Sequence, residues 1–72
     1  LFVGNLPWSA RSEDLRQLFG RIGEVKSARV VSDRETARSR GFGFVEMNAV
    51  DAETAVVELD GSDFMGRSIR VS

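Results

Sequence analysis

The side chains in this sequence that could carry out specific chemistry are aromatic and basic, and they lie on two short apolar segments. In the segment RGFGFVEM, Phe42 and Phe44 alternate with glycines, and Arg40 precedes them at the same spacing of two residues. Phe2 lies in the second segment, LFVGNL, at the start of the chain. Aromatic rings stack on other flat π-systems, and guanidinium groups pair with anions such as phosphate. The chemistry that these residues could provide is therefore binding by stacking and by charge.

The composition excludes most catalytic and metal-binding classes. The chain has no Cys and no His, so disulfide scaffolds, Cys/His zinc sites, thiol nucleophiles and histidine acid–base catalysis are excluded. Gly41 and Gly43 lie inside a strand-like segment and do not form a phosphate-binding loop. We therefore expect a protein that is not an enzyme and that uses no metal and no cofactor. No apolar run approaches the ~18 residues of a membrane span, so no membrane partner is expected.

The length of 72 residues gives the chain room for one small core. Its composition, with 42% hydrophobic and 29% charged residues, is typical of a folded domain. Because residue 1 is Leu and the chain ends on a strand-like segment, we expect one domain over residues 1–72, taken from a slightly longer chain. We expect a monomer with an intracellular location, cytoplasmic in a bacterium and otherwise nuclear, cytoplasmic or organellar.

Hydrophobic spacing predicts two helices, because apolar residues recur at i, i+3, i+4 and i+7. These residues are Leu15, Leu18, Phe19 and Ile22 in the first helix and Ala52, Ala55, Val56 and Leu59 in the second. Ser12 is the expected N-cap of the first helix, which should end at Gly20 or Gly23. Asn48 and Asp51 are the expected caps of the second.

Four segments have the composition of strands: residues 1–6, 25–31, 40–47 and 68–71. With the helices, they give the order strand, helix, strand, strand, helix, strand, which is the split βαβ arrangement. Right-handed crossovers place both helices on one face of a four-stranded antiparallel sheet. We therefore predict an α+β, ferredoxin-like sandwich whose opposite sheet face is uncovered.

Alternation along the third strand predicts which side chains lie on the uncovered face. Arg40, Phe42, Phe44 and Glu46 share one face, and burying two charged groups under the helices would cost more than exposing two rings. Phe42 and Phe44 are therefore expected to be exposed, and Phe2 joins them by the same alternation. The surface would then be aromatic at its centre.

The flanking strands are expected to add basic and polar groups to this face. Arg29 lies on the second strand and Arg70 on the fourth, with Ser27 and Ser68 at the same alternation. Aromatic rings flanked by arginines fit a single-stranded nucleic acid, whose bases stack and whose phosphates pair with guanidinium groups.

Four other large apolar side chains are expected to pack rather than to bind. Phe19 and Phe64 are assigned to the core, because most phenylalanines are buried. Trp8 is expected to cover the edge of the core, although a stacking platform is the alternative, and Met65 is expected to fill space.

The formal net charge of −1 argues mildly against a nucleic-acid binder, but the charges are segregated. Residues 48–63 carry five acidic side chains and no basic one, whereas residues 25–47 carry five basic and three acidic side chains. The acidic second helix would lie behind the sheet, away from the aromatic face.

The segment RGFGFVEM resembles the RNP1 octamer of the RNA recognition motif (RRM) family, and LFVGNL is similar to its RNP2 hexamer. The resemblance covers the whole chain and is strongest to small bacterial, glycine-rich and organellar RNA-binding proteins. It implies that Phe2 and Phe42 stack on successive bases, that Phe44 packs against a sugar or between nucleotides, and that Arg40 contacts a phosphate. Asn5 would add hydrogen bonds to base edges, with a turn-capping role as the alternative. Single-stranded RNA is then the expected partner.

Two departures from the family pattern concern Met47 and Ala37. Met47 replaces an aromatic residue at a core-facing position, which leaves binding unaffected, whereas Ala37 replaces a loop glycine and leaves contacts from Arg34 and Arg38 open. Two alternatives remain from the sequence. The same face could bind single-stranded DNA, or the domain could be an RRM-like module that binds another protein.

Overall fold

The computed structural model describes residues 1–36 and 39–72, with the side chains of Ser39 and Arg40 outside the description. The elements are β1 (Phe2–Gly4), α1 (Ser12–Gly20), β2 (Val25–Ser32), β3 (Ser39–Met47), α2 (Ala49–Leu59), β4 (Asp63–Phe64), β5 (Arg67–Ser68) and β6 (Arg70–Val71). Four strands form an antiparallel sheet in the order β2-β3-β1-β6, and β4 and β5 form a separate hairpin. The predicted fold class is confirmed.

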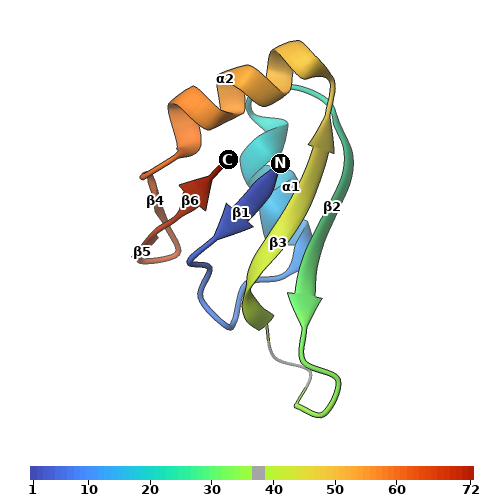
Figure 1. The fold of residues 1–72 in the computed structure, drawn as a ribbon, viewed down its shortest axis with the longest axis vertical. Coiled ribbons are helices and arrows are strands. Elements are labelled where there is room, and N and C mark those ends of the chain that lie inside the picture. The colour runs from blue at the N-terminus through green and yellow to red at the C-terminus, as the bar shows by residue number, and fades with distance from the viewer. Residues whose placement is uncertain (37–38) are drawn as a thin grey trace.

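The helices and the sheet form two layers. In Figure 1, α1 lies behind the strands and α2 crosses the end of the sheet at which β3 stops. The first helix packs on β2 and β3, and the second packs on β3 and β6. No helix among residues 1–36 and 39–72 is long and apolar enough to span a membrane.

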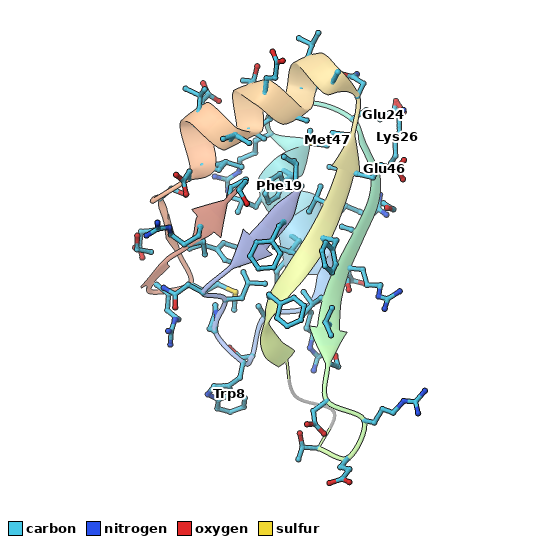
Figure 2. All side chains as sticks on the ribbon, in the orientation of Figure 1. Trp8, Phe19, Glu24, Lys26, Glu46 and Met47 are labelled. Atoms are coloured by element: carbon cyan, nitrogen blue, oxygen red, sulfur yellow. The ribbon has the colours of Figure 1, made fainter. Side chains whose placement is uncertain are left out.

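The core lies between these layers and follows the predicted alternation. Leu15 and Phe19 of α1 and Ala55 of α2 are fully buried, against Val3 and Val45 of the central strands. Figure 2 shows Phe19 behind the strands, as the helical spacing predicts. One face of β1 and β3 therefore packs against the helices, and the other face is open.

Gly43 shows how closely α1 approaches the sheet. A Cβ atom at this residue would lie 2.6 Å from the Arg29 carbonyl oxygen and 3.0 Å from Leu15 Cδ1. The position thus faces the helix, which fixes Phe42 and Phe44, its neighbours in β3, on the opposite face.

The beginning of α1 differs from the prediction. The N-cap position is Arg11, whose backbone N–H donates to Asp14 Oδ2 at 2.9 Å. The Ser12 hydroxyl instead accepts from the Val30 N–H at 3.0 Å and so joins α1 to β2. The cap of α2 is as predicted, because Asn48 Oδ1 accepts from the Asp51 N–H at 3.0 Å.

The first and last strands are shorter than predicted. β1 ends at Gly4 because Asn5 turns into the left-handed region with φ of 58°. At the other end of the chain, Ser68 belongs to the β4-β5 hairpin, and only β6 joins the four-stranded sheet. The expectation that Ser68 lies on the open sheet face is therefore wrong.

Candidate nucleic-acid interface

Three phenylalanine rings meet on the open face of the sheet. Phe2 pairs with Phe44, and Gly4 pairs with Phe42, in the antiparallel register of β1 and β3. The ring centroids of Phe2 and Phe42 are 5.8 Å apart, those of Phe2 and Phe44 5.9 Å, and those of Phe42 and Phe44 6.0 Å. We call these three residues the aromatic cluster.

Gly4 allows Phe2 to lie close to Phe42. A Cβ atom on Gly4 would lie 3.0 Å from Phe2 Cε1, so the ring covers the space that a side chain would take. Since Gly4 is the direct partner of Phe42, a ring above Gly4 comes to lie beside Phe42. The two planes are inclined by only 28°, whereas Phe44 meets both rings edge-on, at 66° and 86°.

The cluster is open to solvent. Phe2 is 42% and Phe44 49% exposed, and Phe42 is half-buried between them. Ring–ring contacts of this kind contribute about 0.5–1.5 kcal/mol each, which holds the rings in place but leaves their outer faces uncovered. A contiguous exposed apolar surface of this type commonly marks a binding site.

The β2 side of the open face carries one basic group and one acidic group. Arg29 pairs with Phe44, so the register places its exposed side chain beside the aromatic cluster. Farther along, Ser27 pairs with Glu46, and the hydroxyl donates to the carboxylate at 3.5 Å. The register shifts at Lys26, and Figure 2 labels this residue near Glu46 at the upper end of the two strands. The acidic group lies at the end of β3 nearest α2.

Arg70 lies on the β6 side of the cluster. It pairs with Gly4, and its side chain is 78% exposed. Its Nε lies 3.9 Å from Asp60 Oδ1, which also accepts from the Val71 N–H at 3.0 Å. Because exposed ion pairs are weak, this contact leaves the guanidinium of Arg70 able to pair with another anion. The side chain of Arg40, the third predicted basic contact, is outside the described side chains, as are residues Ala37 and Arg38.

Sequence reasoning missed Ser72 as a member of this face. Phe2 donates its N–H to the Ser72 carbonyl at 2.8 Å and accepts from the Ser72 N–H at 2.9 Å. Residues paired in this way point their side chains to the same side of the sheet. The alternation that places Arg70 on the open face, continued by two residues, would have identified Ser72.

Both functional groups of Asn5 already have partners in the protein. Its Nδ2 donates to the Ser68 carbonyl at 2.7 Å, and its Oδ1 accepts from Arg67 Nη2 at 2.7 Å. These bonds connect the turn after β1 to the β4-β5 hairpin. They favour the turn-holding role of Asn5 over contact with a base. The bond from Arg67 also places this basic side chain next to the turn.

Two residues that we expected to pack are exposed. Trp8 is 63% exposed and Met65 50% exposed, so the packing prediction is wrong for both. Figure 2 shows Trp8 projecting beyond the lower end of the sheet. Met65 has a φ of 52° and lines a cleft of about 300 Å³ between α1 and residues 63–65, which shares no residue with the aromatic cluster.

The fold and the site define a class of small α+β domain with an open, aromatic sheet face. Residues 1–70 match the RNA recognition motif family, and the chain belongs to this family.

The chain is similar to proteins that have been named for RNA binding. It is 53% identical over its whole length to the chloroplastic RNA-binding protein CP31B of Arabidopsis thaliana, of which it covers 25%. The crystal structure of RNA Binding Protein PG1 superimposes with a TM-score of 0.93 at 53% identity, over 99% of this chain and 87% of that one. The Rna15 RRM with bound RNA (GU) has a TM-score of 0.85 at 26% identity, over 96% of this chain and 74% of that one. This chain spans between about a quarter and about half of the length of four of the curated relatives that it matches.

Proposed function

We propose that this domain binds single-stranded RNA on the open face of its sheet and catalyses no reaction. The observation that carries the proposal is the aromatic cluster, three rings with centroids within about 6 Å of each other on a sheet face that no helix of the described residues covers. Every base has a flat π-face, so such a platform accepts bases of any sequence.

The ring geometry supports different roles for the three phenylalanines. Phe2 and Phe42 are nearly parallel and lie side by side, so each offers its outer face to one of two successive bases. Phe44 stands edge-on to both and is suited to pack against a sugar or between nucleotides. Each stacked base contributes roughly 1–3 kcal/mol.

Charges around the cluster support contact with the RNA backbone. Arg29 and Arg70 lie on the outer strands β2 and β6, one on each side of the rings. We propose that they pair with phosphates together with Arg40, while Asn5, whose side-chain amide is hydrogen-bonded within the protein, holds the turn beside them. The interaction requires no metal and no cofactor, and a monomer suffices.

RNA is favoured over DNA by the relatives. The similar proteins carry RNA in their names, and the Rna15 RRM has RNA bound. The chloroplastic relative also supports an intracellular, organellar location as one setting for this domain.

An amide chemical-shift titration of the domain with random-sequence RNA and DNA pools of about eight nucleotides tests this function. We expect shifts at the aromatic cluster, Arg29 and Arg70, with tighter binding of the RNA pool. Equal affinity for both pools would mean that the ligand is single-stranded nucleic acid in general rather than RNA. A silent sheet face with both pools would contradict the proposal and favour a protein partner.

A further inference from the structure

The turn after β1 presents the largest of the exposed apolar side chains among the described residues. Trp8 is 63% exposed, more than any member of the aromatic cluster. Exposing an indole has an unfavourable free energy, because its burial would remove one of the largest apolar areas of any side chain from water. The exposure of Trp8 therefore needs a physical explanation.

Two hydrogen bonds and a buried residue restrain the backbone of the turn that carries Trp8. The Leu6 N–H donates to the Gly41 carbonyl at 2.9 Å, and the Ala10 N–H donates to the Pro7 carbonyl at 3.0 Å. Ala10 itself is buried in the core. The proline ring fixes its own φ, which further restricts the backbone immediately before Trp8. A large ring on a restrained turn loses little conformational entropy when a ligand binds.

The position of Trp8 continues the aromatic cluster along the strands. The backbone of Leu6 is hydrogen-bonded to that of Gly41, the neighbour of Phe42. Since adjacent strands lie about 4.8 Å apart, Leu6 lies close to the end of the aromatic cluster. Trp8 follows Leu6 by two residues, which span at most about 7 Å. Figure 2 shows Trp8 beyond the end of the sheet at which β1 ends and β3 begins. A strand of nucleic acid that leaves Phe42 in this direction passes next to the indole.

The charges around the turn suit a polyanion. Residues 1–12 contain no acidic side chain, and the exposed Arg11 follows Trp8 by three residues. Arg67 lies on the other side of the same turn, bonded to Asn5. An indole on a turn that carries one arginine and is hydrogen-bonded to another matches a base and its adjacent phosphates.

We propose that Trp8 is an additional stacking platform, which binds one base of the RNA beyond the bases held by the sheet. The inference rests on the proposed function, because it needs the strand to be on the aromatic cluster. It extends the binding surface past the sheet, and it predicts that longer oligonucleotides gain affinity through Trp8 specifically.

Intrinsic fluorescence tests this proposal in the unmodified protein. Trp8 is the sole Trp and the chain has no Tyr, so the emission reports on this residue alone. The probes are oligouridylate, oligoadenylate and oligocytidylate, each at lengths of about four and about eight nucleotides. We expect the longer probes to quench the emission, and the shorter probes to shift the amides of the aromatic cluster with little quenching.

Three variants of Trp8 separate stacking from apolar bulk. Trp8→Ala and Trp8→Leu should lose roughly fivefold to hundredfold in affinity for the longer probe, whereas Trp8→Phe should retain most of it. All three should bind the shorter probe like the unmodified domain. Val57→Ala is the matched control, because Val57 is 82% exposed on α2, away from the sheet face.

The outcomes distinguish this inference from the proposed function. The longer probes could shift the sheet amides without quenching the indole, and their affinity could be unchanged by Trp8→Ala. The proposal that Trp8 stacks on a base would then be wrong, and the proposed RNA-binding function would stand. Equal losses for both probe lengths would also contradict it, because Trp8 would then act through the conformation of the turn. If no probe shifts the sheet amides, both proposals fail together.

Discussion

At the scale of single residues, two glycines determine what the two faces of the sheet can do. Gly43 faces α1, where a Cβ atom would lie 2.6 Å from a backbone oxygen, and Gly4 faces the open side, where a Cβ atom would lie 3.0 Å from the Phe2 ring. The neighbour of Gly43 is backbone and cannot move easily, whereas the neighbour of Gly4 is a side chain that can rotate. The same added methyl group should therefore have different effects at the two positions.

Gly43→Ala should destabilise the domain by about 1–3 kcal/mol, because the added atom forces β2, β3 and α1 apart. Gly4→Ala should change the unfolding free energy by less than about 0.5 kcal/mol but displace Phe2 and weaken RNA binding several-fold. Chemical denaturation and RNA titration of both variants measure the two effects. Equal stability loss in both variants would show that the two glycines do not face opposite sides.

Phenylalanines on the two faces should also respond differently to truncation. Phe42→Ala should lose roughly 1–3 kcal/mol of binding free energy and keep its fold, because its ring belongs to the open face. Phe19→Ala should lose about 3–5 kcal/mol of stability, because Phe19 is fully buried. Amide spectra and denaturation curves distinguish the two cases. Unfolding of Phe42→Ala would contradict our assignment of the faces.

At the scale of secondary-structure elements, Ser12 joins the first helix to an edge of the sheet. β2 is the outermost strand on its side, so alternate N–H groups point away from β3. The Val30 N–H is one of them, and the Ser12 hydroxyl accepts it at 3.0 Å. This bond satisfies a partly buried donor and fixes where α1 begins relative to β2.

Ser12→Ala should cost about 1–3 kcal/mol of stability, because it leaves the Val30 N–H without its acceptor. Ser12→Thr keeps an oxygen in place and is the control. Amide hydrogen exchange should show faster exchange at Val30 in the alanine variant and little change in the threonine variant. Unchanged exchange at Val30 in both variants would mean that solvent replaces the hydroxyl without cost.

The elements themselves could be predicted from the sequence, whereas contacts between them could not. Alternation along RGFGFVEM and the charges of Arg40 and Glu46 were sufficient to place Phe42 and Phe44 on the open face. The partner of Ser12 lies 18 residues away, so local sequence favoured a capping role that the fold assigns to another residue. The exposure of Trp8 depends on how its turn is anchored to Gly41, which no local pattern records.

At the scale of the whole molecule, a near-neutral domain can bind a polyanion because most of its acidic residues lie away from the open face. Glu46 at the end of β3 and Asp60 beside Arg70 are exceptions. The net charge is −1, yet five acidic residues fall within residues 48–63, most of them on α2, while Arg29 and Arg70 lie on the open face. With a Debye length of about 8 Å at physiological ionic strength, charges behind the sheet are largely screened from a ligand in front of it. Local charge therefore governs the encounter more than net charge does.

This arrangement predicts a shallow dependence of affinity on salt. Binding to a single strand should lose about 0.7 log units of affinity per log unit of salt for each phosphate that is neutralised. With only a few arginines at the face, the slope of log affinity against log salt concentration should be no steeper than roughly −2. Stacking supplies the rest of the affinity and depends little on ionic strength.

The contribution of one arginine can be measured by the slope. Arg70→Gln should reduce its magnitude by about 0.7, because one phosphate contact is lost, and should leave the affinity that remains at high salt almost unchanged. Arg21→Gln, on the exposed surface after α1, is the matched control and should leave the slope as it is. Titrations with one RNA probe at several salt concentrations provide all three slopes. If Arg21→Gln lowers the slope as much as Arg70→Gln does, overall charge rather than the open face attracts the RNA, and the separation of charges by the sheet has no role in binding.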